Sequence, residues 1–563
     1  MTKYKELLKK YLPLIAFLAA AAWLFYQIYP IIFATHDDMR NYTLVRRGIL
    51  FEDALRSAKN GRISHLWNHL LLGLPYLANS LPVYKAIVFA AYLFDLLALG
   101  LLLSRLSDQP LAHMTLLLST AWSSISTQHN LLISYGLCHQ IPVGLLCLSL
   151  YCFLLRYEKN KRLYTLLSCI LLLFSCMIYE AFTAAMLLFA LLALTLPETE
   201  ETSYLRYLLR AVCRVLPQLA VVLCYMAVYF TWQHFYPPFY DGTSFDIHEP
   251  FLSVQTAGIY AISFFPLVNI IDYANDSPLG LRSFLQQITP VGWMAAALTA
   301  AAFAMLLPRV KTDTERLRRT LVFTFAGIFV PCAVIGFSKK YIGWVKNGFI
   351  GYLPAFYSFL FLTAFLCCAG VLIYRSVHEK HRRTTAVIVM TAFVFSMCLC
   401  ATAMNRLFGV YFGELSLRYR NFDKAVSSEL VTQCDETWQL FAPDNAGIHA
   451  RADYTEDYLK IYNPADVAYV QGGTPRDPEK KTLCMRSPAD YSFAVLCEAD
   501  EALHAQTVTI TTTLDAVGVS LRLTGGEHYV ATVTDGTVLT APEGVVFDLS
   551  ERPTREPVKC GTE

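Results

Sequence analysis

Charged residues are scarce in this sequence. Asp, Glu, Lys and Arg make up 16% of its 563 residues, whereas 55% are hydrophobic and the mean hydropathy is +0.41. Soluble globular domains carry about 25% charged residues, so this composition excludes an ordinary soluble domain and predicts a membrane protein with an appended polar part. The formal net charge is only +2, and without a basic excess nothing indicates a nucleic-acid partner.

Closely spaced cysteines are also missing. The 16 cysteines lie mostly in apolar stretches and form no C-x-x-C pair, which excludes the common zinc and redox motifs. The neighbours Cys367 and Cys368 are therefore interpreted as small core residues. The first apolar stretch, 12–33, is long enough to span a membrane, and no A-x-A cleavage pattern follows it. We expect it to be retained as the first helix.

Apolar stretches of spanning length recur up to about residue 404 and then stop. A bilayer core about 30 Å thick needs about 20 apolar helical residues, and about eleven stretches come close to that length. They lie at 12–33, 82–104, 110–127, 136–156, 162–179, 181–197, 212–233, 290–307, 320–338, 350–374 and 384–404. The sequence therefore predicts an α-helical polytopic membrane domain over residues 1–404.

Loops rich in Lys and Arg predict the orientation, because such loops face the cytoplasm. The basic segments are 3–10, 159–162, 206–214, 309–319 and 375–383. An arrangement of eleven spans puts all of them inside. It puts outside the first loop 34–81, the segment 128–130, Tyr179 with Glu180, the loop 234–289 and the tail 405–563. We therefore expect a multi-pass membrane protein with a cytoplasmic N-terminus and an extracytoplasmic C-terminal domain.

Two apolar stretches are unusual. Residues 251–271 are uncharged but rich in Ser, Thr, Gln and Asn, and a span here would move the basic segment 309–319 outside. A re-entrant or surface-lying segment is favoured over a span. Residues 163–196 contain a single charge, Glu180, and one helix of that length would measure about 50 Å. A hairpin that bends at Tyr179 and Glu180 is therefore expected.

The polar parts of the chain have their own patterns. In the first outer loop, 50–58 has apolar residues on one helical face and ends at Asn60-Gly61, which predicts a short amphipathic helix along the membrane interface. Residues 405–440 are expected to form a helical connector. The alternation in 507–513, 517–523 and 528–533 predicts strands of a β-rich domain over 441–563. Cys484 and Cys497 either form a disulfide there or remain free thiols.

Asp37 and Asp38 follow the first span directly. Ionisable residues at membrane depth are costly and tend to be functional. An adjacent acid pair can supply a base, or it can hold a divalent ion such as Mg²⁺ or Mn²⁺ against a diphosphate. The alternative is a solvated helix end. We regard both aspartates as catalytic candidates, and as the metal ligands if a divalent ion is used.

Further polar side chains are predicted on the same outer face. Glu180, next to Tyr179, either binds sugar hydroxyls or orients a base, or it is a hairpin tip in contact with water. Lys339, Lys340 and Lys346 alternate with aromatic residues and suit an anionic head group, either that of the substrate or that of ordinary phospholipid. The other candidate ligands are His36, Arg40, Arg62, Trp67, His129 and His139. The three histidines show no H-x-x-H spacing, so local hydrogen bonding is favoured over a metal site.

The order of these features resembles the GT-C class of membrane glycosyltransferases and, more narrowly, the GtrII-type glucosyltransferase family of bacterial surface-polysaccharide modification. The resemblance covers about residues 10–435. The shared features are an acid pair in the first outer loop, amphipathic helices and many spans. The residues that carry it are 36–40, 60–62, Trp67, 175–180 and 418–425. It does not cover the β-rich tail.

The resemblance implies a hexose donor, most like glucose, linked to a polyprenyl phosphate and used on the outer face. The acceptor would be a surface glycan or a lipid-linked acceptor. Asp37 or Asp38 would be the base of a single inverting displacement, while Lys and Arg side chains neutralise the leaving phosphate. Glu180 stands where an amide is expected. The outer loops contain no D-x-D motif, which favours a metal-independent reaction.

Three other functions compete with this one. A transporter or flippase of lipid-linked sugars should show inverted repeats and paired broken helices, and the sequence has no such pairing. A surface-polysaccharide polymerase or ligase would share a site on the outer face. A non-catalytic scaffold would only display the C-terminal domain.

Overall fold

The computed structural model describes residues 2–546, except 79, 126–129, 197–203, 240–241, 243–248, 277–283, 349–350, 352–353, 428, 443–451, 466, 472–476, 487–492, 500–505, 513–516, 524–527, 534–537 and 542–544. The chain divides into two compact units. Unit 1 comprises Met1–Tyr29 and Leu50–Gly409, and unit 2 comprises Pro30–Ile49 and Val410–Glu563. The segment 30–49, which carries the acid pair, thus belongs with the C-terminal residues, a grouping that the sequence did not predict.

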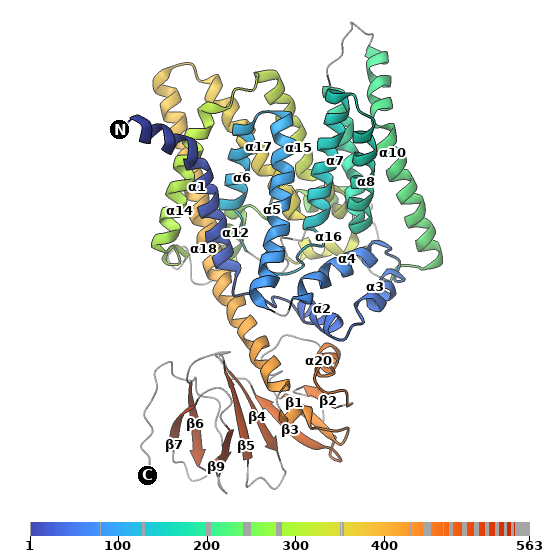
Figure 1. The fold of residues 1–563 in the computed structure, drawn as a ribbon, viewed down its shortest axis with the longest axis vertical. Coiled ribbons are helices and arrows are strands. Elements are labelled where there is room, and N and C mark those ends of the chain that lie inside the picture. Colours follow the sequence, from blue (N-terminus) through green and yellow to red (C-terminus); the bar gives the residue numbers. More distant parts are fainter. Residues whose placement is uncertain are drawn as a thin grey trace. The chain divides into compact units, whose positions relative to one another are not determined.

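Unit 1 is helical (Figure 1). Its helices are α1 (Thr2–Ile28), α3 (Leu50–Ala58), α4 (Ser64–Gly73), α5 (Leu81–Leu106), α6 (Gln109–Ala121), α7 (Gln140–Lys159), α8 (Leu163–Ile178), α9 (Met186–Thr195), α10 (Tyr204–Phe235), α11 (Pro250–Ile262), α12 (Pro266–Asp276), α14 (Pro290–Leu306), α15 (Thr314–Gly336), α16 (Lys339–Lys346), α17 (Ala355–Ser376) and α18 (Lys380–Val426), with 3-10 turns η1 (Leu74–Leu77), η2 (Glu180–Ala185) and η4 (Leu307–Arg309). The unit boundary at residue 409 falls within α18.

Eight helices in the described part of the chain are long and apolar enough to cross a membrane, namely α1, α5, α7, α10, α14, α15, α17 and α18. The prediction of an α-helical polytopic membrane protein is therefore confirmed. The remaining three predicted stretches are helical but short, since α6 has 13 residues, α8 has 16 and α9 has 10. A helix of about 20 residues is needed to span the bilayer core, so these three do not meet the length expected of a complete span.

The two unusual apolar stretches both bend. The pair formed by α11 and α12 turns by 111° at its break, which excludes one straight spanning helix in 251–271. In 163–196 the helix ends at Tyr179, whose backbone is extended with φ −145°. Arg214 donates to Ala193 O at 3.0 Å, and Tyr157 donates to Arg214 O at 3.2 Å. The end of α9 therefore lies close to the end of α7, and the predicted hairpin is confirmed.

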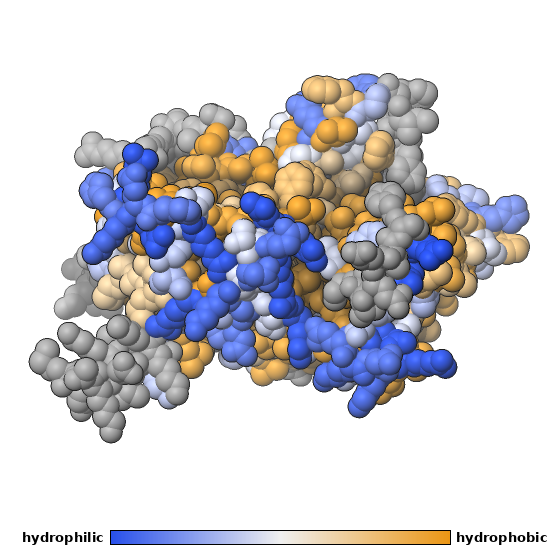
Figure 2. All heavy atoms as spheres, turned by 90° about the horizontal axis from the view of Figure 1, so that it is seen from above, coloured by the Kyte–Doolittle hydropathy of each residue, from blue (hydrophilic) through white to orange (hydrophobic). Residues whose placement is uncertain are grey.

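Arginines gather at one end of unit 1. Arg316 Nε donates to Leu106 O at 3.0 Å, and Arg319 donates to Thr195 O at 3.1 Å. Cations stabilise the negative C-terminal ends of helices, so these side chains fix the ends of α5 and α9. Figure 2 shows hydrophilic residues crossing the face seen from above. The basic segments 159–162, 206–214, 309–319 and 375–383 thus share one end, and α15 runs from that end toward α16 at the other.

Unit 2 contains α2 (His36–Arg46), α19 (Glu429–Thr432), α20 (Ala452–Leu459) and two sheets. The first sheet has the order β2-β1-β3-β4-β5-β8 and the second has the order β7-β6-β9. The strands are β1 (Trp438–Ala442), β2 (Ala468–Gln471), β3 (Lys481–Arg486), β4 (Phe493–Ala499), β5 (Gln506–Thr512), β6 (Val517–Leu523), β7 (His528–Val533), β8 (Val538–Ala541) and β9 (Val545–Val546). β1 pairs in parallel with β2 and β3, and the other pairs are antiparallel.

The predicted strands of the tail are confirmed, because β5, β6 and β7 coincide with 507–513, 517–523 and 528–533 to within a residue. Helix α18 ends at Val426, before the end of the helical connector predicted over 405–440, and β1 begins at Trp438. The register places Cys484 directly opposite Cys497 on neighbouring strands. That pairing of the backbone is the arrangement a disulfide would use, and the disulfide stays a prediction.

Candidate functional site

Arg62, Ser64 and Glu180 form one polar cluster in unit 1. The guanidinium of Arg62 approaches Glu180 Oε1 through Nη2 at 2.5 Å and donates to it through Nε at 2.8 Å, and Ser64 Oγ donates to Oε2 at 2.7 Å. The side chains of Arg62 and Glu180 are only 13% and 20% exposed. Both oxygens of Glu180 are thus used, and the ion pair ties the first loop to the tip of the α8–α9 hairpin.

A cavity of about 150 Å³ opens beside this cluster. Arg62, Tyr179 and Glu180 form its polar side. Most of the remaining wall comes from α10, α15 and α16, through Met226, Tyr229, Phe230, Gln233, Val334, Ile335 and Tyr341. The cavity is therefore amphiphilic, with a charged pair on one side and mostly apolar or aromatic side chains on the others, interrupted by the polar Thr183, Gln233 and Ser338.

The sequence did not lead us to expect that α10 lines this cavity. Its apolar run looks like a lipid-facing span, and only 28% of its candidate span is buried inside the protein. A signal was available in Tyr229 and Gln233, which lie one helical turn apart and are hydrogen-bonded at 3.1 Å. Polar residues spaced by four in an apolar helix mark a face that does not contact lipid.

Gly61 sets the turn that presents Arg62. Its φ is +89°, and a Cβ added there would lie 2.5 Å from the Cα of Pro238. We expect Gly61→Ala to lower the stability by about 2 kcal/mol or more, because left-handed strain alone costs about 1–2 kcal/mol and the neighbouring backbone cannot give way. Thermal unfolding of the purified protein measures the effect.

Gly48→Ala is the matched control for that substitution. Gly48 also has a positive φ, +71°, but nothing lies within 4 Å of an added Cβ. The Gly48→Ala variant should therefore lose only the stability that corresponds to the strain of a side chain at positive φ. Equal losses at the two positions would contradict a specific role for the close approach to Pro238.

The other predicted ligands of unit 1 are scattered around the cluster. His139 is buried, and its ring meets Tyr179 edge-on at 4.6 Å. Lys340 Nζ lies 5.0 Å from the Trp344 ring, and Lys346 pairs with Glu249 at 3.0 Å, a partner that the sequence did not reveal. Lys339 and Trp67 are exposed. His129 lies outside the described residues.

In unit 2, Asp38 has a structural role. Thr35 caps α2, and Asp38 completes a capping box. Its Oδ2 accepts hydrogen bonds from Ala34 N at 3.0 Å, Thr35 N at 2.8 Å and Thr35 Oγ1 at 3.0 Å, and the residue is 3% exposed. Such a box stabilises the start of a helix. Asp38 therefore orders the first turn of α2.

Asp37 is the accessible carboxylate of the pair. Its side chain is 34% exposed, and Oδ1 lies 3.6 Å from His36 Nε2. Arg40 follows one turn later on the same helix. The geometry thus distinguishes two residues that the sequence left equivalent. The Asp37 carboxylate is partly exposed to solvent, while the Asp38 carboxylate accepts hydrogen bonds from the backbone at the start of α2.

A metal site that used both carboxylates would compete with the capping of α2. Asp38 Oδ2 already accepts three hydrogen bonds, whereas carboxylates that bind Mg²⁺ offer their oxygens to the ion. In the part of the chain that the structure describes, no group of three His, Cys, Asp or Glu side chains is arranged to hold a metal ion.

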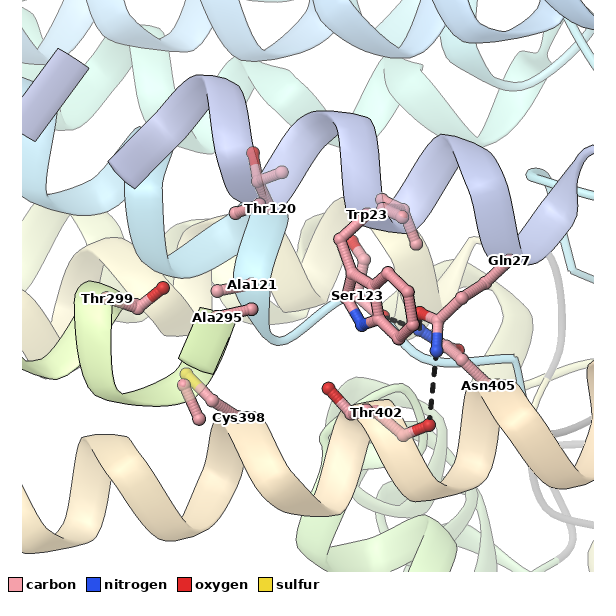
Figure 3. A pocket seen from close by; sticks show the side chains of 13 residues that line it. Trp23, Gln27, Thr120, Ala121, Ser123, Ala295, Thr299, Cys398, Thr402 and Asn405 are labelled. Carbon is pink, nitrogen blue, oxygen red and sulfur yellow. Dashed lines mark hydrogen bonds between the residues drawn. The ribbon is translucent and has the colours of Figure 1, made fainter. Parts of the chain in front are cut away.

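A smaller cavity of about 20 Å³ lies among α1, α6, α14 and α18 (Figure 3). Asn405 joins three elements beside it, donating to Gln27 Oε1 at 3.2 Å and Ser123 O at 2.9 Å while its Oδ1 accepts from Ile125 N at 2.7 Å. A space of this size holds about one water molecule. It is too small for a substrate, so we interpret the network as structural.

No family model matches the sequence, and no curated protein matches it. Three solved structures of the oligosaccharyltransferase of Archaeoglobus fulgidus are similar to this chain. One is AglB in complex with an inhibitory peptide and a dolichol-phosphate, one is the apo form, and one is tethered to an acceptor peptide containing the NVT sequon. Identity is 13%, the TM-scores are 0.35, 0.37 and 0.35, and the matches cover 83–84% of this chain. They cover 64–65% of those chains, so this chain spans just under two thirds of their length.

Proposed function

We propose that this chain is a GT-C-type membrane glycosyltransferase of the GtrII kind. It transfers a hexose, with glucose as the first candidate, from a polyprenyl-phosphate-linked donor to a surface glycan or lipid-linked acceptor. The observation that carries the proposal is the amphiphilic cavity of unit 1, whose polar side is the Arg62–Glu180 pair and whose other walls are mostly apolar or aromatic. A lipid-linked sugar phosphate has the same division between a charged head and an apolar chain.

Arg62 is assigned to the phosphate of the donor. A guanidinium recognises phosphate through paired donors, and the contact with Glu180 holds its plane in one orientation. Lys340, on the nearby α16, is assigned to the same phosphate group as Arg62. As the bond between the sugar and the phosphate breaks, negative charge grows on the leaving phosphate, and fixed cations lower the energy of that state.

Asp37 is assigned as the base. The oxygen of an acceptor hydroxyl attacks the anomeric carbon, and the bond from that carbon to the phosphate oxygen breaks with its electron pair going to the phosphate. Asp37 takes the proton of the hydroxyl. One displacement of this kind inverts the anomeric centre. Asp37 suits this role because it is exposed, whereas Asp38 caps α2.

The proposed orientation puts the basic end of unit 1 in the cytoplasm of a bacterial cell. Its support is the gathering of the basic loops at that end and the tendency of such loops to stay inside. Single cysteines at position 36 and in 310–316 should then react with a membrane-impermeant thiol reagent from opposite sides. Labelling of both from one side would contradict this topology.

A transporter with inverted repeats would carry paired broken helices. Among the described residues, the bent apolar stretches include the α11–α12 pair and the α8–α9 hairpin, so the transfer and flux assay below decides between an enzyme and a flippase. A polymerase or ligase would differ in the acceptor, so only a transfer assay separates those functions.

The test uses full-length protein in nanodiscs, radiolabelled glucosyl polyprenyl phosphate and the surface glycan fraction of the organism that encodes the chain. Transfer of label to the glycan is expected. Label that only crosses the bilayer when the protein is in liposomes would overturn the enzyme assignment in favour of a flippase. Transfer of preassembled oligosaccharide instead of a single hexose would favour a ligase.

A further inference from the structure

The helix that carries Asp37 packs against a short helix of the C-terminal region within unit 2. Arg47, which follows α2, pairs through Nη1 with Asp457 Oδ1 of α20 at 2.5 Å. The rings of Tyr42 on α2 and Tyr458 on α20 stack with their centroids 5.9 Å apart. The C-terminal region thus contributes directly to the surroundings of the acid pair.

Asp423 anchors this arrangement from α18. Its Oδ1 accepts a hydrogen bond from Tyr458 at 2.5 Å and another from Tyr462. Burial raises the pKa of both phenols well above the usual range, so both remain protonated donors at physiological pH. Asp423 lies in the segment 418–425 that the sequence singled out, and its contacts give that segment a structural role.

Tyr454 lies one turn before Tyr458 on α20 and contacts the N-terminal part of α2. Its half-buried ring has its centroid 5.9 Å from that of His36, and Arg40 Cζ lies 5.8 Å from the same ring. His36 and Arg40 are one turn apart on α2, and Asp37 lies between them in sequence and 3.6 Å from His36. An aromatic ring, a carboxylate and a planar guanidinium therefore meet on one small surface.

This combination suits a neutral sugar. One face of a pyranose carries C–H groups that pack on an aromatic ring, while its hydroxyls donate to a carboxylate and accept from a guanidinium. The charges of Asp37 and Arg40 offset each other, so a charged ligand gains no net attraction here, and a purely apolar ligand would leave Asp37 and Arg40 without water. The chemistry therefore points to an uncharged pyranose unit.

We propose that Tyr454 is the stacking platform for the acceptor sugar, with Arg40 and His36 as its polar neighbours, so that the C-terminal region helps to select the acceptor. The inference rests on the proposed function, since it needs Asp37 to act on an acceptor hydroxyl. It gives the C-terminal region a part in recognition as well as in folding.

The test compares Tyr454→Ala and Tyr454→Trp in the full-length protein, with glucosyl polyprenyl phosphate as donor and the surface glycan fraction as acceptor. Loss of the ring should raise the acceptor KM about tenfold, the equivalent of about 1.4 kcal/mol of lost apolar contact, and leave the donor KM unchanged. Tyr454→Trp should keep the acceptor KM within about twofold, because it retains a flat apolar face.

Tyr411→Ala is the control, because it removes a tyrosine that is 55% exposed on α18 and has no assigned role. An unchanged acceptor KM in Tyr454→Ala would overturn the inference. So would a fall in kcat with both KM values intact, since that result would mean that Tyr454 only supports α2. If the wild-type protein transfers no sugar at all, the proposed function fails instead, and the two failures are thereby distinguished.

Discussion

Asparagine in place of Asp37 is expected to lower kcat for sugar transfer by a factor of about 100 to 10,000, the usual contribution of a positioned base. The amide has nearly the same shape as the carboxylate but cannot take the proton of the acceptor hydroxyl. Because Asp37 is 34% exposed, the substitution should leave the melting temperature unchanged. Initial rates with labelled donor, normalised to folded protein, measure the effect.

Asp38→Asn is the matched control, since it makes the same chemical change at the next residue. Asp38 accepts three hydrogen bonds at the start of α2, so its loss should cost about 1 kcal/mol of stability, as for other helix caps. The rate per folded molecule should remain within a few-fold of wild type. Full activity in Asp37→Asn, or an equal loss of rate in both variants, would sink the assignment of Asp37 as the base.

The second large effect is expected at the Arg62–Glu180 pair. Glu180→Ala leaves a largely buried guanidinium without its carboxylate, and breaking a fully buried pair costs about 3–5 kcal/mol. The cost here should be smaller, about 2–3 kcal/mol, because part of each side chain reaches solvent. Both stability and transfer should fall, which by itself does not separate a structural role from a functional one.

A double variant separates them. Arg62→Met with Glu180→Leu replaces the pair with apolar groups of similar size, a change that is often neutral for stability. We expect the melting temperature to recover toward the wild-type value while transfer stays lost, because the phosphate then has no guanidinium to bind. Recovery of transfer together with stability would show that the pair only holds the hairpin in place.

Much of the fold could be predicted because it follows from local patterns. The bend at Tyr179, the amphipathic helix α3 and the strands β5, β6 and β7 are all visible in hydrophobic periodicity. The short helices α8 and α9 show the limit of that method. Hydropathy measures how apolar a stretch is but does not show where its helix ends, and eight of the eleven predicted stretches form helices of spanning length among the described residues.

The site was predicted less completely, for two different reasons. Arg62 and Glu180 are 118 residues apart, and no local pattern pairs them. The difference between Asp37 and Asp38 could have been found, since Thr35-x-x-Asp38 resembles a capping box. That spacing indicates the capping role of Asp38 and separates it from Asp37, the residue proposed as the base.

The length of the α8–α9 hairpin has a consequence for the lipid around it. Helix α8 has 16 residues and is therefore about 24 Å long, about 6 Å less than a typical hydrocarbon core. Starting from the basic end, the chain reaches Glu180 before it has crossed a bilayer of ordinary thickness. A hydrophobic mismatch of this kind is accommodated by local thinning of the membrane or, under the proposed function, by a donor whose head group lies deeper than those of the neighbouring lipids. Under that proposal, the acyl-chain length of the surrounding lipid becomes a determinant of access to the cavity.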